Sequence, residues 1–212
     1  MKWATRELIH FDRIASAWLI LRFIDPDATF AYLKKDERVG DDVNLFGVPG
    51  VRLAMHDGQS TTFRRILEVY SISEAALERI SKIVTDGVNH VMHDASRSGI
   101  SKRDPLAGGA LAVTEGIFLL SASDEECLVR CLPLYDALYA RLLAQVTLDQ
   151  SAHLSRESVF TQTVSLANAT CELRQRQLKF SQAAFADALK AAVPIKRGEG
   201  PSGLPADPIS CA

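Results

Sequence analysis

The chain has 212 residues, of which 47% are hydrophobic and 24% charged, so it can bury a core of its own and is not a disordered protein. Its formal charge is −2, from 24 basic and 26 acidic residues, and this balance argues against nucleic-acid binding over a broad surface. The longest apolar run near the amino terminus, Ile14 to Ile24, contains Ser16 and Arg22 and is too short to span a membrane.

Neither a secretory signal nor a disulfide framework is predicted. Glu7 and Asp12 precede the first apolar run, and no small-residue cleavage site follows it. Without an export signal, the four cysteines are expected to be reduced thiols, which places the protein in the cytoplasm. Cys127 and Cys131 are one helical turn apart and are expected to be small core residues.

The amino-terminal third is predicted to alternate between short strands and one buried helix. Asp12 suits the N-cap of a helix over Arg13 to Ile24, whose apolar residues recur at helical spacing. Asp25-Pro26 ends that helix, because a residue before proline avoids helical backbone angles. Strands are predicted over residues 2–5, 28–33, 43–48 and 51–55, and the Pro49-Gly50 turn divides the last two.

The rest of the chain is predicted to be helical. Ser60 or Thr61 caps a helix that runs to Tyr70, and Ser73 caps the next helix. Asp104-Pro105 starts a helix, because it combines an N-cap with proline at the first helical position. The remaining predictions are an irregular loop over 86–103 and helices over 105–120, 124–146 with a bend or break at Pro133, and 155–190.

These elements predict an α+β fold, in which a small amino-terminal sheet packs against a mainly helical layer and a long carboxyl-terminal helix is added. The expected organisation is a domain over residues 1–147, a helical extension over 148–192 and a flexible tail over 193–212. The tail holds half of the prolines together with three glycines, a composition typical of disorder. In the long helix, apolar residues recur every seven positions, which favours packing on the protein's own body or on a partner subunit.

Three histidines are candidate metal ligands or proton-transfer groups. His56 lies in the turn Met55 to Gly58, where an imidazole can bind a metal or transfer protons near neutral pH. His90, His93 and Asp94 form an H-x-x-H-D motif, and two imidazoles with a carboxylate suit a divalent transition metal such as zinc, iron or manganese. The alternative is that these are solvated polar residues.

Arg6 and Arg13 are candidate anion ligands, because both flank the amino-terminal end of the first predicted helix. Guanidinium groups and free backbone N–H groups at such an end suit an oxyanion or a carboxylate. The alternative is ion pairing with a neighbouring aspartate such as Asp12. Arg22 lies about two and a half turns from Arg13, and so on the opposite side of the helix.

The helical part adds further candidates. Glu115 lies in an apolar helix, so it either faces solvent or is buried with a partner or a metal. Tyr135 and Tyr139 share one face of a helix, and Tyr135 can line a pocket together with Asp136 and Asp12. The alternative for Asp136 is a simple ion pair with Arg141 or a neighbouring arginine.

Several short segments of the chain together resemble the sequence motifs of a known protein family. They are residues 2–6 (KWATR), 12–20 (DRIASAWLI), 22–26 (RFIDP), 46–50 with 56–58, 106–116 and 134–139. In these segments the chain resembles the C-terminal domain of the ChrB-type chromate resistance proteins, over about residues 1–147.

The resemblance implies a role in chromate resistance, as a sensor or an accessory protein beside a chromate transporter. A DNA-binding regulator is not expected, because the full-length regulators of the family carry a separate amino-terminal domain that this sequence lacks. Family members have Cys-Pro where this chain has Ser16-Ala17, and a cysteine near Thr61. If the family's chemistry uses those thiols, this chain has lost that part or acts differently.

The favoured hypothesis is a cytoplasmic protein that binds a metal ion or an oxyanion, with metal-dependent catalysis left open. In it Arg6 and Arg13 hold the anion, His56 and Glu115 act as catalytic groups, and Glu115 or the histidine pair completes a metal site. The expected partners are a small anion or small molecule and a second copy of the chain, with neither nucleic acid nor membrane. The alternative is a non-catalytic sensor or interaction module that dimerises through its carboxyl-terminal helix.

Overall fold

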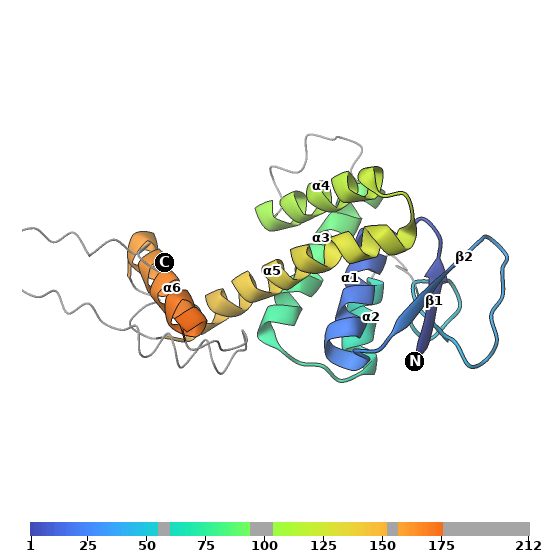
Figure 1. Cartoon of the computed structure of the whole chain (residues 1–212), viewed down its shortest axis with the longest axis horizontal. Coiled ribbons are helices and arrows are strands. Elements are labelled where there is room, and N and C mark those ends of the chain that lie inside the picture. The colour runs from blue at the N-terminus through green and yellow to red at the C-terminus, as the bar shows by residue number, and fades with distance from the viewer. Residues whose placement is uncertain (55–59, 94–103, 152–156, 176–212) are drawn as a thin grey trace, which may run out of the picture. The chain divides into compact units, whose positions relative to one another are not determined.

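The computed structural model of the chain forms two compact units, Met1–Tyr139 and Ala140–Ala212 (Figure 1). The residues that it describes are 1–54, 60–93, 104–151 and 157–175. Within them, no helix is long and apolar enough to cross a membrane. The predicted end of the first domain near residue 147 stays a prediction, and the predicted tail over 193–212 lies outside the described residues.

A three-stranded parallel sheet forms one layer of the first unit, in the order β2-β1-β3. β1 (Lys2–Arg6) is central and pairs along its whole length with β2 (Thr29–Leu33), so that Trp3 lies opposite Phe30. Residues 3–5 of β1 are buried, as expected for a central strand with neighbours on both sides. Both strands confirm the positions predicted for them to within a residue.

The third part of the sheet is shorter than predicted. β3 is only Asn44–Leu45, and beyond it the described residues add an isolated bridge between Phe46 and Leu53. The two long strands predicted over 43–48 and 51–55 are therefore wrong in extent. Gly47 and Gly50 adopt positive φ angles of 61° and 80°, which interrupt the extended backbone that a strand requires.

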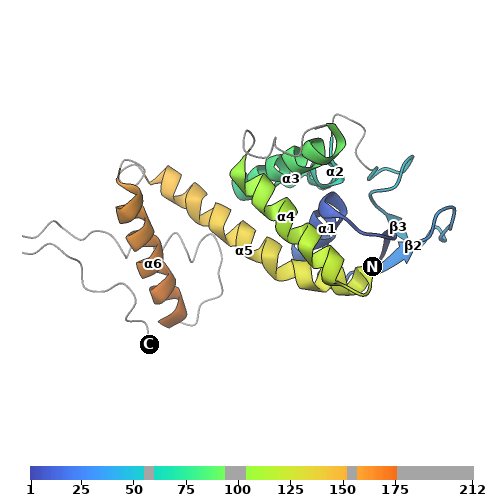
Figure 2. The ribbon, with the colours of Figure 1, turned by 90° about the horizontal axis from the view of Figure 1, so that it is seen from above.

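α1 (Phe11–Leu19) lies in the centre of the first unit and continues into a π-helical turn, η1 (Ile20–Ile24). Most residues of α1 are buried, since it contacts helices on several sides. Figure 2 shows this arrangement from above. The helix ends where predicted but begins two residues early, with His10 rather than Asp12 at the N-cap. The helices that it contacts are α2 (Thr62–Val69), α3 (Ala75–His93) and α4 (Pro105–Leu120).

Two of these helices begin where their capping residues predict. The Thr61 side chain accepts a hydrogen bond from the Arg64 N–H at 3.2 Å, and Asp104 accepts one from the Leu106 N–H at 2.9 Å. The end of α3 differs from the prediction, because residues 86–93 are helical rather than part of a loop. Gly87 lies within that stretch and packs directly against the Phe11 ring, a tertiary contact that extends the helix.

α5 (Asp124–Gln150) crosses from the first unit into the second and continues through Pro133, where a bend or break was predicted. Cys127, Cys131 and Tyr135 are buried on both sides of the proline, so packing offsets the loss of one backbone hydrogen bond.

α6 (Val159–Gln175) is the described part of the long helix predicted over 155–190. It begins at Val159 because Ser158 caps it, accepting a hydrogen bond from the Thr161 N–H at 3.2 Å. The predicted continuation over 176–190 lies outside the described residues. A small sheet, a helical layer and a carboxyl-terminal helix together confirm the α+β class.

Candidate functional site

The carboxyl edge of the sheet is where both candidate anion ligands originate. β1 ends at Arg6, and the turn Glu7–His10 leads directly into α1. Open sheets of parallel strands bind ligands at this edge, because strands end there and helices begin there. The contacts of this turn therefore decide what the edge can hold.

Two charged side chains hold the β1–α1 turn. Arg13 donates from Nη1 to the carbonyl oxygen of Arg6 at 2.6 Å and from Nη2 to that of Leu8 at 2.7 Å. Asp124, the first residue of α5, accepts from the backbone N–H groups of Leu8 at 3.0 Å and Ile9 at 2.7 Å. These bonds stabilise the unfavourable φ of 58° at Leu8 and fix the path of the turn.

Arg13 is a partly buried cation in this turn. Burial lowers its pKa from the ordinary value, and the negative charges of Asp124 and Asp12 oppose that change. Its stem covers Gly47, where a Cβ atom would lie 2.8 Å from Arg13 Cγ, so glycine is required by both space and φ. Beside it, the Thr5 hydroxyl is buried with no hydrogen-bond partner among the described residues.

Arg6 has a related role on the other side of β1. Its Nη1 donates to the carbonyl oxygens of Lys34 and, at 3.3 Å, of Glu37, which ties the segment after β2 to the central strand. Carbonyl oxygens orient a guanidinium group without neutralising its charge. Anion binding by Arg6 and Arg13 stays a prediction, and the structure adds that both cations are held in place.

Asp12 caps α2 rather than its own helix. Its Oδ2 accepts from the Thr62 N–H at 2.9 Å and its Oδ1 from the Phe63 N–H at 3.0 Å. The prediction of an N-cap for α1 was wrong because α1 begins at Phe11, which places Asp12 in the first turn and directs its carboxylate to a neighbouring helix. Whether Asp12 also lines a pocket stays a prediction.

The two positions at which the resembled family carries thiols both lie beside Asp12. The buried Ser16 hydroxyl is 3.5 Å from Asp12 Oδ1. Thr61 is buried and immediately precedes the first of the two N–H groups that Asp12 accepts. A hydroxyl is neither a soft metal ligand nor an electron donor of the kind a thiolate is, so these two side chains do not supply thiol chemistry.

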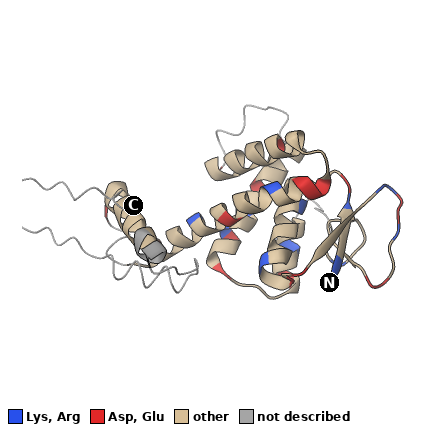
Figure 3. Cartoon of the chain, in the orientation of Figure 1, with Lys and Arg blue, Asp and Glu red and all other residues tan. Residues whose placement is uncertain are grey.

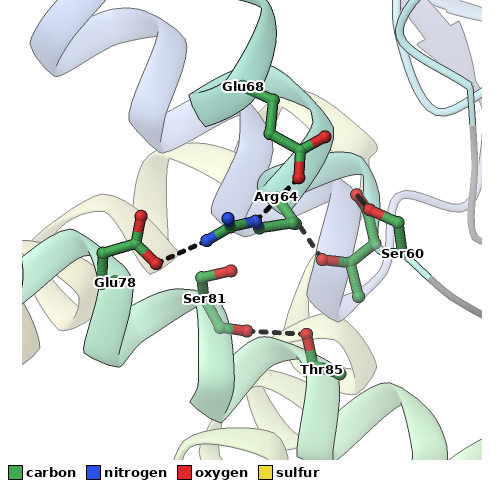
Figure 4. Close-up of polar contacts among 7 residues, drawn as sticks. Ser60, Arg64, Glu68, Glu78, Ser81 and Thr85 are labelled. Atoms are coloured by element: carbon green, nitrogen blue, oxygen red, sulfur yellow. Dashed lines mark hydrogen bonds and ion pairs between the residues drawn. The ribbon is translucent and has the colours of Figure 1, made fainter. Parts of the chain in front are cut away.

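Arg64 connects α2 to α3 (Figure 4). Its Nε donates to Glu68 at 2.9 Å and its Nη1 to Glu78, and these contacts raise the pKa of Arg64, with the bond to Glu68 the largest cause. All three side chains are more than a third exposed, so water screens the network and its contribution to stability is small. The network positions α2 and is not itself a candidate binding site.

Asp136 fastens η1 to α5. Its Oδ1 accepts from Trp18 Nε1 and from Arg22 Nε, both at 2.8 Å, and its Oδ2 accepts from Arg22 Nη2 at 2.8 Å. The hydrogen bonds from Arg22 hold the pKa of Asp136 below its ordinary value. The structure therefore contains an ion pair at Asp136, as the alternative predicted, but the partner is Arg22, 114 positions away in sequence, and not Arg141.

Tyr135 and Tyr139 lie in one aromatic cluster on the same face of α5, as their spacing predicts. Their ring centroids are 6.0 and 5.9 Å from that of Trp18. Tyr135 donates its hydroxyl to the carbonyl oxygen of Phe11 at 3.3 Å, and Tyr139 donates to Glu74 at 2.8 Å. Burial raises the pKa of both phenols, so both are neutral donors that support the core. A pocket lined by Tyr135 stays a prediction.

His10 is a residue of this region that sequence reasoning missed. Its ring lies edge-to-face against Phe118 of α4, with 5.8 Å between centroids, and the half-buried Glu115 is close enough to act on it. Burial lowers the pKa of His10, and Glu115 opposes that shift. The sequence carried no signal for it, because the helix was predicted to begin after Asp12 and the structure alone places His10 at the N-cap.

The predicted metal ligands fall mostly beyond what the structure describes. His56 and Asp94 lie outside the described residues, and His90 and His93 lie on the last turn of α3 rather than in a loop. Among the described residues, no group of three or more histidine, cysteine, aspartate or glutamate side chains is arranged to hold a metal. The metal site and the roles of His56 and Glu115 stay predictions.

Cys127 and Cys131 are buried free thiols in α5, which confirms their place in the core. Burial raises the pKa of both, that of Cys131 to about 12. Thiols of this kind are inert toward electrophiles and metals at neutral pH.

Comparison with known proteins identifies the family to which the chain belongs. Residues 3–142, about two thirds of the chain, match the family described as ChrB, C-terminal domain, and the chain belongs to that chromate resistance family. A particular relative is Protein ChrB of Cupriavidus metallidurans, which is 37% identical over 84 residues, or 39% of this chain and 26% of the relative. The matched segment thus spans about a quarter of that relative's length. No solved structure matches the chain.

Proposed function

We propose that this chain is the oxyanion-binding domain of a chromate resistance system and takes its ligand at the carboxyl edge of the sheet, beside the amino-terminal end of α1. The observation that carries the proposal is Arg13, a partly buried cation that carbonyl oxygens hold at that edge. Close to it is the Thr5 hydroxyl, which has no hydrogen-bond partner among the described residues. A small anion would add negative charge beside Arg13 and accept a hydrogen bond from the Thr5 hydroxyl.

The charges around Arg13 leave room for this role. Asp12 and Asp124 each accept two backbone N–H groups, so their carboxylates are directed toward α2 and toward the turn itself. Arg6 supplies a second positive charge at the carboxyl end of β1. An anion placed at this edge would also face the first turn of α1, where backbone N–H groups have no partner within the helix.

His56 and a divalent transition metal belong to an extended form of the same proposal. In that form His56 serves as ligand or proton-transfer group, Glu115 or the pair His90 and His93 completes the site, and the metal acts as a Lewis acid on the bound anion. Elemental analysis of the purified protein tests this form directly. Stoichiometric zinc, iron or manganese that is lost in His56→Ala supports it, and metal-free wild-type protein excludes it.

Equilibrium dialysis with chromate, and separately with sulfate, tests oxyanion binding. Wild type is expected to bind, and Arg13→Gln and Arg6→Gln should each weaken binding by about 10-fold or more, the effect of losing one charged hydrogen bond. Lys2→Gln is the matched control, because Lys2 is an exposed cation at the opposite end of β1. Equal chromate affinity in Arg13→Gln and wild type, with both folded by circular dichroism, would contradict the proposal.

A second candidate is a non-catalytic interaction module that associates through its carboxyl-terminal helix. The observation in its favour is that Val159 and Phe160, at the start of α6, are 80% and 66% exposed. Sedimentation velocity on Phe160→Asp tests it, since loss of a wild-type dimer in that variant would assign the interface to α6.

A further inference from the structure

α4 has an apolar face that the rest of the described chain leaves uncovered. One side of the helix, which includes Ala107, Leu111 and Thr114, is buried against α3 and α1. The other side is also apolar, and Figure 3 shows almost no charge along the helix. A helix that is apolar all round normally has neighbours all round. The exposed large residues on this face are Leu106 (44%), Val113 (49%), Leu119 (80%) and Leu120 (76%).

The uncovered face alternates large and small side chains at the spacing of a helix–helix seam. Leu106, Gly109, Val113, Gly116 and Leu120 follow one another by three and four residues, which aligns them in one stripe along the helix. Among the described residues, no atom outside the helix's own backbone lies within 4 Å of the positions that Cβ atoms would occupy at Gly109 and Gly116. Both glycines are therefore open depressions between larger side chains.

We propose that this face of α4 pairs with the same face of a second copy of the chain, with the two helices antiparallel. In an antiparallel pair of identical helices, the residue numbers of any two facing residues add up to the same value. One register therefore places Leu106 over the partner's Gly116 and Val113 over the partner's Gly109. The same contacts then recur by symmetry, so that every large side chain of the stripe between these positions meets a depression. A surface that is complementary to itself in this way defines an isologous dimer.

Charge agrees with this occupant. The ionisable residue within α4 is Glu115, which lies toward His10 and away from the stripe, so self-pairing buries no unpaired charge. At the carboxyl end of α4, Arg130 donates to the Leu120 carbonyl oxygen at 3.4 Å and pairs with Glu126 of α5. Antiparallel pairing sets the two helix dipoles in opposite directions.

The exposed area also fits a dimer. The four large side chains, of which Leu119 lies beside the stripe, expose on the order of 500 Å² per copy. This area is comparable to the largest apolar patches on monomers, which are often functional, and is more than half of the about 800 Å² per partner of a standard interface. We therefore expect an association in the micromolar range rather than an obligate dimer. The inference uses residues outside both proposed functions, so its failure would leave the oxyanion site standing.

Sedimentation velocity over a series of concentrations of the full chain tests the proposal. Wild type should dimerise, Val113→Glu should weaken the dimer by at least about 100-fold, and Phe160→Asp should leave it unchanged. Gly109→Leu is the second variant. It has room in the monomer and removes the depression that the partner's Val113 enters, so it should weaken the dimer while circular dichroism shows the fold intact.

Two results would overturn the inference. Wild-type protein that stays monomeric up to about 100 μM would show that no second copy binds this face with useful affinity. A dimer that survives Val113→Glu and Gly109→Leu but is lost in Phe160→Asp would assign the contact to α6. A cysteine pair, Leu106→Cys with Gly116→Cys, checks the register, because the double variant should form a disulfide-linked dimer more readily than either single variant.

Discussion

Replacement of Asp12 by alanine should destabilise the first unit more than any change at an exposed carboxylate. In the structure the Asp12 carboxylate accepts hydrogen bonds from the N–H groups of Thr62 and Phe63 at 2.9 and 3.0 Å. Both of those residues are fully buried. Alanine leaves both donors in a dry environment without partners and removes a negative charge from a helix amino terminus.

The size of the effect follows from those two bonds. A hydrogen bond to a charged group contributes about 1.5–3 kcal/mol, and loss of a helix cap costs about 0.5–2 kcal/mol. Thr61 still caps α2 through the Arg64 N–H, which limits the loss. We expect Asp12→Ala to lower the free energy of unfolding by about 2–4 kcal/mol, and Asp12→Asn, which keeps one acceptor oxygen, by about half as much.

Urea unfolding followed by tryptophan fluorescence measures this change. Trp3 and Trp18 are both buried in the first unit and are the two tryptophans of the chain, so the signal reports that unit alone. Asp42→Ala is the control, because Asp42 is 69% exposed and pairs with the exposed Lys2 at 3.2 Å. If Asp12→Ala and Asp42→Ala both cost less than about 0.5 kcal/mol, the capping role assigned to Asp12 is refuted.

Three further outcomes are expected. Hydrogen bonds from Arg22 lower the pKa of Asp136 in the folded state. The contribution of Asp136 to stability is therefore present above the unfolded carboxyl pKa of about 4 and is lost as pH falls through the folded pKa. Asp136→Asn should flatten the acid limb of a stability–pH profile measured by urea unfolding. Burial raises the pKa of the Cys127 and Cys131 thiols, so iodoacetamide at pH 8 followed by peptide mass mapping should leave both unlabelled until urea unfolds the protein; rapid labelling of native protein would contradict their burial. Gly87→Ala should cost about 1–3 kcal/mol although alanine favours helix, because its Cβ would overlap the Phe11 ring; a stabilised variant in thermal unfolding would refute that contact.

Local chemistry in the sequence was enough to locate most of the elements. Asp104-Pro105 predicts the start of α4 because an N-cap and a first-turn proline act on their own neighbours, and the same holds for Thr61 at α2. Asp25-Pro26 predicts the end of η1 for a similar reason. The extent of α3 was missed, and of the two outcomes predicted at Pro133 a break does not occur, while a bend stays a prediction. Both features depend on the packing of Gly87, Cys131 and Tyr135.

For the candidate site too, the sequence predicted what depends on local geometry and missed what depends on tertiary contacts. Spacing alone brings Tyr135 and Tyr139 to one face and sets Arg22 apart from Arg13, because both results follow from the geometry of a single helix. The partners of charged groups were decided by tertiary structure. Asp12 reaches a helix 50 positions away, Asp136 an arginine 114 positions away, and Asp124 a turn more than 100 positions away. Hydrogen bonds of this range depend on how elements pack, and residue type by itself carries no information on packing across such separations.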